Sequence, residues 1–278
     1  MKKINRRSFL AAAGLTAAAL ALTACGGSAS STASSTASSA ASSEAASTSA
    51  AAELTTVEAG KLTMATNAAF PPYEMTTDAG EFEGIDIATA KAIAEKLGLE
   101  LQIDDMDFDA ALLSVQQGKA DIVMAGVTVT DERKAVMDFS DSYATGIQSI
   151  IVPEGSDITS PDDLAGKKIG TQRGTTGYIY CSDDFGDDAV VAYDDGLTAV
   201  QALNNGQVDA VVIDNAPAKE FVAANPGLVI LDTSYAEEDY AIGLAKGSAL
   251  EDAVNAALEE LKADGTLQSI VDKYITAE

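Results

Sequence analysis

From Leu62 onward, short apolar runs alternate with segments whose apolar residues recur at helical spacing. The continuous apolar runs predict buried strands, and residues 84–87 read as a further short strand. The expected strands cover residues 62–66, 100–103, 120–125, 168–171, 189–192 and 209–213. The expected helices cover residues 87–97, 106–117, 174–180, 196–204, 248–262 and 267–274. This alternation indicates an α/β fold with mixed, mostly parallel sheets flanked by helices.

Two stretches of the chain share one pattern. GKADIVMAG at 118–126 and GQVDAVVID at 206–214 each follow a predicted helix and contain a glycine, an aspartate and a hydrophobic strand. The similarity is short, but it predicts two lobes of like architecture.

Residues 62–75, LTMATNAAFPPYEM, place a polar loop directly after a predicted strand. The strand breaks at residues 67–69, and we expect no regular structure directly beyond Pro71 and Pro72. In open α/β sheets, ligands bind beyond the carboxyl ends of the strands. The loop with Asn67 and Phe70 is therefore expected to form one wall of a small-molecule pocket. The alternative is a surface loop whose Phe70 fills the core.

Three later stretches, around 128–133, 172–176 and Asp214, would supply the other walls of that pocket.

The first 25 residues have the form of an export signal. Basic residues at Lys2, Lys3, Arg6 and Arg7 precede an apolar run over 9–24. A charged start followed by a short apolar run is typical of a signal peptide that is removed from the mature protein. The adjacent arginines fit a twin-arginine signal, and an ordinary secretion signal fits as well.

Leu22-Thr23-Ala24-Cys25 resembles the lipobox of bacterial lipoproteins. Cleavage before Cys25 would expose its thiol for lipidation, which predicts an extracytoplasmic protein anchored to the cell membrane. Residues 26–56, rich in Ser, Ala and Thr, cannot bury enough apolar area to offset the entropy of ordering, so we expect a disordered tether there.

Composition narrows the range of functions. The chain has 43 acidic and 17 basic residues, a net charge of −26, which argues against nucleic acid as a partner because phosphate binding needs clustered Lys and Arg. Histidine is absent, which excludes His-dependent triads and His metal sites. We therefore expect no metal and no cofactor. Besides Cys25 the one thiol is Cys181, expected to be a small apolar side chain rather than a reactive group.

Together these stretches resemble the bacterial extracellular solute-binding proteins of family 3, the amino-acid capture components of ABC importers. The resemblance covers about residues 57–278. It rests on FPPYEM at 70–75, GEFEGIDIATAKAIAEKLG at 80–98, MDFDAALLSVQQGKADIVMAGVTVTDERKAVMDFSDSY at 106–143, DDLAGKKIGTQRGTT at 162–176 and GTLQSIVDKY at 265–274.

The resemblance implies a two-lobed periplasmic-binding fold of type II, with the ligand in the cleft between lobes that close by a hinge. Lobe 1 would comprise residues 57–146 and return over 241–278, and lobe 2 would comprise 147–240. The implied partners are a free amino acid and an ABC permease in the membrane, and the implied state is a monomer.

The resemblance also assigns roles in the pocket. Arg133 would clamp the ligand carboxylate, helped by Gly126, Thr128 and the backbone N–H of Thr176. Asp214 would accept the ligand ammonium. Taken alone, Arg133 reads as a solvated first-turn residue of a helix capped by Thr130 or Asp131, and Asp214 as a turn residue.

An aromatic pair, Phe70 and Phe108, would sandwich the ligand side chain, although either residue alone reads as plain core. Asn67 stands where relatives that take cationic amino acids carry Asp. Together with Gln172 it favours an uncharged polar ligand. Arg173 would favour an acidic ligand if it turned inward, and would be a surface charge otherwise.

Two other functions share this fold. Some relatives are periplasmic dehydratases, and the acidic residues would supply a general acid. A ligand sensor that reports to a membrane partner is the other. Because no dedicated acid–base pair is evident, we expect a binding protein with no catalytic residues.

Overall fold

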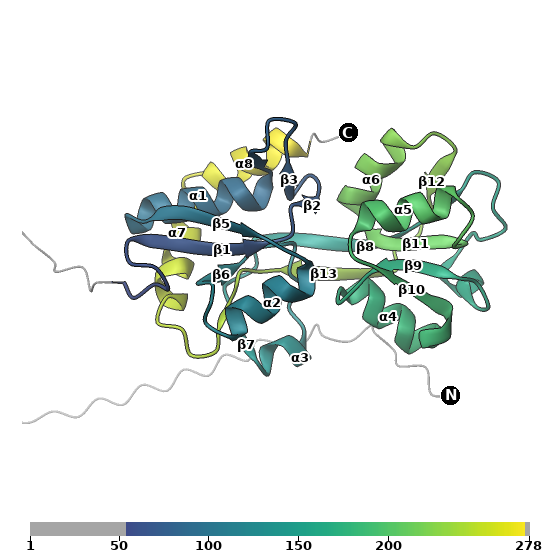
Figure 1. Cartoon of the computed structure of the whole chain (residues 1–278). Coiled ribbons are helices and arrows are strands. Elements are labelled where there is room, and N and C mark those ends of the chain that lie inside the picture. The colour runs from purple at the N-terminus through teal and green to yellow at the C-terminus, as the bar shows by residue number, and fades with distance from the viewer. Residues whose placement is uncertain (1–53, 276–278) are drawn as a thin grey trace, which may run out of the picture. The chain divides into compact units, whose positions relative to one another are not determined.

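The computed structural model describes residues 54–275 of the 278-residue chain, and they form two lobes, each built on a mixed sheet (Figure 1). The first sheet has the order β5–β1–β6–β14–β7. Its strands are β1 (Lys61–Thr66), β5 (Glu100–Asp105), β6 (Ile122–Val123), β7 (Met137–Phe139) and β14 (Gly243–Ala245). β1 pairs in parallel with β5 and β6, whereas β14 is antiparallel to β6 and β7.

The second sheet has the order β10–β9–β11–β8–β12, with β13 also paired to β8. Its strands are β8 (Ala144–Pro153), β9 (Ile169–Gln172), β10 (Val190–Tyr193), β11 (Ala210–Asp214), β12 (Leu228–Ile230) and β13 (Ala236–Tyr240). β9 is parallel to β10 and β11, and the three pairings of β8 are antiparallel.

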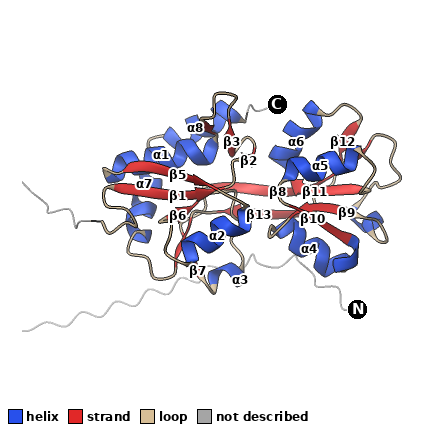
Figure 2. Cartoon of the chain, viewed as in Figure 1, coloured by secondary structure: helices blue, strands red, loops and turns tan. Residues whose placement is uncertain are grey.

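Helices cover both faces of each sheet (Figure 2). The helices of the first lobe are α1 (Ile85–Leu97), α2 (Phe108–Gln116), α3 (Asp131–Lys134), α7 (Glu251–Ala263) and α8 (Thr266–Tyr274). Those of the second lobe are α4 (Thr176–Phe185), α5 (Gly196–Asn204) and α6 (Asn215–Ala224), with short 3-10 turns η1 (Pro161–Leu164) and η2 (Asp187–Ala189). Each sheet therefore has two apolar cores, one on each face.

A small separate sheet follows β1. It consists of β2 (Ala69–Phe70), β3 (Glu74–Thr76) and β4 (Phe82–Glu83), in that order. Phe70 pairs with Glu74 across its first two strands. This short sheet carries two side chains of the cavity described below.

The two repeated stretches occupy matching places in the two sheets. Asp121, before β6, accepts the backbone N–H of Thr63 at 2.8 Å, and Asp209, before β11, accepts that of Lys168 at 2.7 Å. Each aspartate thereby ties the start of one strand to its parallel neighbour. The repeat is a structural unit, and it brings its last residues, Gly126 and Asp214, to the edges of the sheets that face the cavity.

The chain crosses between the sheets twice, once from β7 to β8 and once from β13 to β14. The two crossings are hydrogen-bonded to each other. The Tyr143 N–H donates to the Tyr240 carbonyl at 2.9 Å, and the Ser140 N–H donates to the Ile242 carbonyl at 2.9 Å. The first lobe is thus discontinuous in sequence, while the lobe boundaries at 146/147 and 240/241 stay predictions.

The observed elements differ from the sequence pattern in places. Residues 84–87 are not a strand, because α1 already begins at Ile85. The strand expected over 120–125 shrinks to two residues.

Missing from the prediction are α6 and the strands β2, β3, β4, β7, β8, β12, β13 and β14. Most of these are antiparallel strands. They lack the pattern that predicted the parallel strands, which is a continuous apolar run followed by a segment with helical spacing of apolar residues. The expectation of no regular structure directly beyond Pro71 and Pro72 is wrong, because β3 begins at Glu74 and pairs with β2 and β4.

The predicted signal peptide, the lipidation site Cys25 and nearly all of the tether lie outside the described residues. The chain packs onto the first lobe slightly earlier than the expected boundary at 56/57, because Leu54 is half-buried against its core. Among the helices of residues 54–275, none combines the length and apolar character needed to cross a bilayer.

Gly146 offers a direct test of the crossing region. A Cβ at Gly146 would overlap the fully buried ring of Tyr240. We expect Gly146→Ala to lower the free energy of unfolding by about 1–3 kcal/mol, measured by urea denaturation, because an overpacked core must shift. Thr145→Ala, at the exposed neighbouring position, is the control. A loss equal to that of the control would contradict the packing described here.

Candidate functional site

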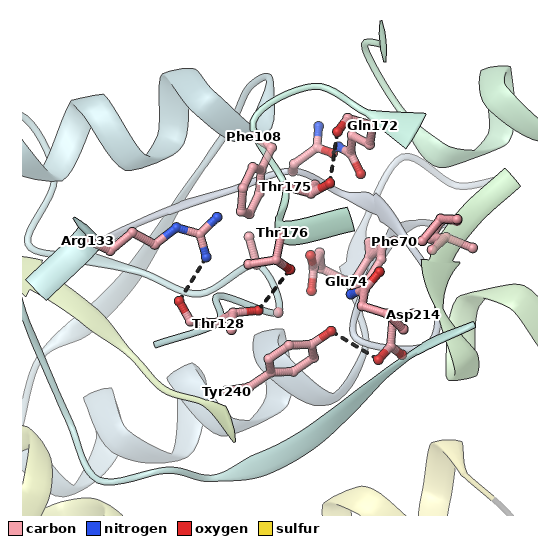
Figure 3. Close-up of a pocket in the computed structure, with 16 residues that line it drawn as sticks. Phe70, Glu74, Phe108, Thr128, Arg133, Gln172, Thr175, Thr176, Asp214 and Tyr240 are labelled. Carbon is pink, nitrogen blue, oxygen red and sulfur yellow. Dashed lines mark hydrogen bonds between the residues drawn. The ribbon is translucent and has the colours of Figure 1, made fainter. Parts of the chain in front are cut away.

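A cavity of about 450 Å³, including space open to solvent, lies where residues of the two lobes meet (Figure 3). All nine residues predicted to bind the ligand line it: Asn67, Phe70, Phe108, Gly126, Thr128, Arg133, Gln172, Thr176 and Asp214. They come from both lobes and are up to 147 positions apart in sequence, since Asn67 and Asp214 are both among them. The structure therefore brings the whole predicted set together, and their contacts with a ligand stay a prediction.

Arg133 enters the cavity from the short helix α3. Thr130 caps that helix, as expected from the local sequence. Arg133 is only 8% exposed, so the interpretation of Arg133 as a solvated first-turn residue is wrong. Its Nη1 donates to the Thr128 carbonyl at 2.8 Å and its Nη2 to the Gly174 carbonyl at 3.1 Å. Burial lowers the pKa of the guanidinium from its ordinary value, yet arginine stays protonated in proteins.

The guanidinium also lies over the Phe108 ring, 5.4 Å from its centroid. Cation–π attraction and the two carbonyls hold it in place. Two of its five N–H donors serve those carbonyls, so within residues 54–275 three donors remain for another acceptor.

The amino terminus of α4 faces the same cavity. Thr175 caps the helix by accepting the N–H of Tyr178 at 3.3 Å. The N–H groups of Thr176 and Gly177 have no acceptor among the described residues, as is usual in the first turn of a helix. Open N–H groups and the helix dipole favour an anion at this end.

Asp214 ends β11 and caps α6. Its Oδ1 accepts the N–H of Ala216 at 3.0 Å, and its Oδ2 accepts the N–H of Ile147 at 2.7 Å and the Tyr240 hydroxyl at 3.0 Å. Burial raises the pKa of Asp214 to about 6, and these three hydrogen bonds oppose the rise. A carboxylate has about four acceptor positions, so one is left for a donor in the cavity.

Asn67 and Gln172 meet across the cavity, one from each lobe. Gln172 Nε2 donates to Asn67 Oδ1 at 2.9 Å, and Asn67 Nδ2 donates to the Met106 carbonyl at 2.9 Å. Phe70 and Phe108 lie nearby on the wall of the cavity, and Phe70 packs partly against the cores of both lobes. The amide pair is neutral, so this end of the cavity carries hydrogen-bonding groups without a fixed charge.

Gly126 stands at the end of the first repeated stretch, in a left-handed conformation with φ of 55°. A Cβ there would lie 2.8 Å from Phe70 Cε1 and 3.3 Å from the Tyr240 ring. Glycine is required both for the backbone angle and for the close approach of the two aromatic rings.

Arg173 points away from the cavity. Its side chain is 52% exposed, donates to the Ala192 carbonyl at 3.4 Å and lies 3.8 Å from Asp194. Of the two alternatives, the surface charge is the correct one, and the argument for an acidic ligand loses its support. Cys181 is fully buried in a core of the second lobe, as a small apolar side chain would be.

Seven residues that line the cavity were not predicted: Glu74, Ala125, Gln148, Thr175, Val212, Ile213 and Tyr240. Glu238, which was not predicted either, contacts two of the lining threonines. Glu238 Oε2 accepts hydrogen bonds from three donors: Thr128 Oγ1 at 3.1 Å, Thr176 Oγ1 at 3.0 Å and Gln148 Nε2 at 2.9 Å.

Glu238 thereby joins a residue of each lobe. Glu74 was within reach of sequence reasoning, because it lies in the FPPYEM stretch. Glu238 and Tyr240 come from a strand that carries no recognisable pattern. No group of three or more Cys, Asp or Glu side chains suited to a metal ion occurs in residues 54–275.

Comparison with known proteins agrees with this geometry. The family description "Bacterial extracellular solute-binding proteins, family 3" matches residues 62–277. The chain belongs to this family. Its members are substrate-binding transport proteins of amino-acid ABC transporters and not enzymes, which removes the dehydratase alternative.

Three relatives show the range of ligands in the family. A probable histidine-binding protein of Neisseria gonorrhoeae is 32% identical over 99% of this chain and 98% of the relative. The L-cystine-binding protein TcyJ of Escherichia coli is 33% identical over 80% of this chain and 85% of the relative. A solved ancestral arginine-binding protein bound to glutamine is 42% identical, with a TM-score of 0.75, over 78% of this chain and 99% of that structure.

The raised pKa of Asp214 predicts a pH dependence of stability. The folded protein binds this proton more tightly than the unfolded chain, so the contribution of Asp214 to stability is greatest below its ordinary pKa and falls as the pH rises through about 6. Relative to Asp214→Asn, the free energy of unfolding of the ligand-free wild type should fall by about 2 kcal/mol between pH 4 and 7.

Urea denaturation at several pH values measures this difference. Asp183→Asn, at an exposed position of α4, sets the baseline for the loss of one carboxylate. A difference between wild type and Asp214→Asn that stays constant over this range would contradict the burial of an ionised Asp214.

Proposed function

We propose that this protein captures one free amino acid in the cavity between its lobes and delivers it to an ABC permease. The observation that carries the proposal is a complementary pair of charges in one cavity. Arg133 and the amino terminus of α4 offer donors, and Asp214 offers an acceptor. A free amino acid presents the matching carboxylate and ammonium groups.

The ligand carboxylate would lie between the remaining donors of Arg133 and the N–H groups of Thr176 and Gly177. Charge-assisted hydrogen bonds from a planar guanidinium bind a carboxylate in bidentate fashion, which an ammonium does not reproduce. Thr128 and Gly126 would border the α-groups. Because the donors come from both lobes, binding would draw the lobes together, and the two hydrogen-bonded crossings would be the hinge.

The ligand side chain would extend between Phe70 and Phe108 toward Asn67 and Gln172. Amide groups both donate and accept hydrogen bonds, so this pair suits an uncharged polar side chain, and an amide such as that of glutamine fits best. One solved ancestral arginine-binding protein has glutamine bound, which is a precedent for an amide ligand, and another has arginine bound.

A basic amino acid is the second candidate. The cavity region contains three buried carboxyl groups, Glu74, Asp214 and Glu238, and only one buried arginine, Arg133. An excess of acidic groups favours a cationic ligand.

The remaining parts of the proposal concern the chain outside the lobes. A lipid on Cys25 would hold the mature protein outside the cytoplasmic membrane, and residues 26–53 would let a monomer reach its permease. Export by either of the two secretion routes is compatible with the signal. A sensor role would use the same site, and transport is favoured by the family to which the chain belongs.

Binding is tested by calorimetry and thermal shift with the ligand-free lobes against the twenty amino acids and cystine. A ligand at a hundred times its dissociation constant should stabilise the protein by about 2.7 kcal/mol. Arg133→Lys should weaken binding at least tenfold, because lysine has no planar fork. Arg173→Lys, the same change at an exposed arginine, should bind like wild type. No shift with any amino acid would contradict the proposal.

Ligand choice is tested by Asn67→Asp. A carboxylate at this position should improve the affinity for arginine relative to glutamine by about tenfold or more, since a buried charge pair replaces a neutral contact. Asn205→Asp, an exposed position, should leave the ratio of the two affinities unchanged. Wild type that prefers arginine over glutamine would favour the second candidate instead.

A further inference from the structure

Glu74 is an unusual member of the cavity wall. Its residue is 0% exposed, and neither of its carboxyl oxygens has a conventional hydrogen-bond partner within residues 54–275. Figure 3 shows its side chain in the middle of the lining residues, between Phe70, Thr176 and Tyr240. A buried polar group without partners is costly, so it calls for an explanation.

Asp86, on α1, provides half of that explanation. It is also fully buried, and its Oδ2 accepts the Gly126 N–H at 3.0 Å and the Tyr143 hydroxyl at 2.7 Å. Its other oxygen, Oδ1, has no conventional donor among the described residues, and the Asp86 side chain is adjacent to that of Glu74. Two adjacent carboxyl groups satisfy each other only when one of them carries a proton that it donates to the other.

The surroundings favour Glu74 as the holder of that proton. Asp86 already accepts two hydrogen bonds that stabilise its charge, whereas Glu74 accepts none. Burial, and then the charge of Asp86, raise the pKa of Glu74 well above its usual range. The titratable groups that face Glu74 from the neighbouring elements are Asp86 on α1, Asp105 on β5, Asp214 on β11, Tyr73 before β3 and Tyr143 before β8.

All of these neighbours are acids or phenols, and the cation of the cavity, Arg133, already contacts two carbonyls and a ring. The empty cavity therefore has no positive group at Glu74, and a proton takes that place.

We propose that Glu74 and Asp86 form a second cation-binding subsite in the cavity, in which a cationic nitrogen of the ligand replaces the proton shared by the two carboxyl groups. This inference rests on the proposed function. In the empty cavity the Glu74 O–H donates to Asp86. When the ligand arrives, that O–H bond breaks, the proton leaves to solvent, and the ionised Glu74 accepts hydrogen bonds from the ligand nitrogen.

The subsite differs from Asp214 in what it does on binding. At pH 7.5 Asp214 is already ionised, because this is well above its pKa of about 6, and it accepts the ligand without releasing a proton. Glu74 binds a cation only by losing its proton. Ligand uptake should therefore release protons, at most one per site, and the association constant should rise with pH by at most tenfold per pH unit.

Calorimetry of the wild-type lobes with glutamine and with arginine measures the proton count. The same titration is run at pH 7.5 in phosphate and in Tris, whose ionisation enthalpies differ strongly, and the dependence of the observed heat on buffer gives the number of protons released. Release with both ligands would place the α-ammonium at Glu74 instead of Asp214, which would overturn a second subsite. Release with arginine alone places the side-chain guanidinium there. Binding without release overturns the inference and leaves the proposed function standing.

Glu74→Gln separates the subsite from a structural role. Glutamine keeps the shape and donates to Asp86, but it has no proton to exchange. The variant should bind with no proton release and with at least tenfold lower affinity for the releasing ligand. Glu81→Gln, an exposed position before β4, should behave like wild type in both respects. Proton release that persists in Glu74→Gln overturns the assignment.

Difference infrared spectroscopy gives a readout that needs no variant to fold. The carboxylic acid C=O band of Glu74 should be present in the ligand-free wild type and should disappear when the ligand binds. A band that persists in the complex overturns the inference. No binding of any amino acid overturns both the inference and the proposed function, and the calorimetric titration distinguishes that case by its absent heat.

Discussion

The arrangement of the whole binding region depends on the pairing of the two chain crossings. Residues near Ser140 and Ile242 exchange backbone and hydroxyl hydrogen bonds, and Tyr143 and Tyr240 continue the pair into β8 and β13. Because each sheet buries its own apolar cores, the lobes do not share a large core that would fix their relation. This narrow pair of strands therefore links the lobes, and Tyr240 also extends from it to the cavity and to Asp214.

Near these crossings, the cavity region contains buried charged side chains of both signs, held by hydrogen bonds. Arg133 is held by carbonyls of both lobes, Asp214 by three donors, and Glu238 by two threonines and a glutamine. Buried charges need such partners, and in the proposed function the remaining hydrogen-bonding capacity of Arg133 and Asp214 would receive the two charged groups of a zwitterion. The site is thus prepared for charged groups before a ligand enters, which reduces the reorganisation that binding requires.

Sequence reasoning found the parallel half of each sheet and the nine predicted cavity residues, but for different reasons. Local pattern reveals β11, a continuous apolar run from Ala210 to Ile213, and β1, in which apolar Leu62 and Met64 alternate with Thr63. Arg133 and Asp214 are ordinary residues in local pattern, and only the resemblance to a family singled them out.

Glu238 and Tyr240 were not predicted because the residues that they contact lie far from them in the sequence. Glu238 bonds to Thr128, 110 positions away, and Tyr240 bonds to Asp214, 26 positions away on another strand of the second sheet. No window of neighbouring residues contains that information. Glu74 escaped for another reason, since its significance lies in the absence of partners, which only packing reveals.

The contacts that join the lobes around Arg133 and Glu238 have a thermodynamic consequence of their own. The bonds from Arg133 to Gly174, from Gln172 to Asn67 and from Thr176 to Glu238 are made by the protein with itself. In the proposed function each would favour a shut form of the ligand-free carrier, and the apparent affinity would rise with the fraction already shut. The tightness of uptake would then depend on the bonds that the two lobes make with each other as well as on those that they make with the solute.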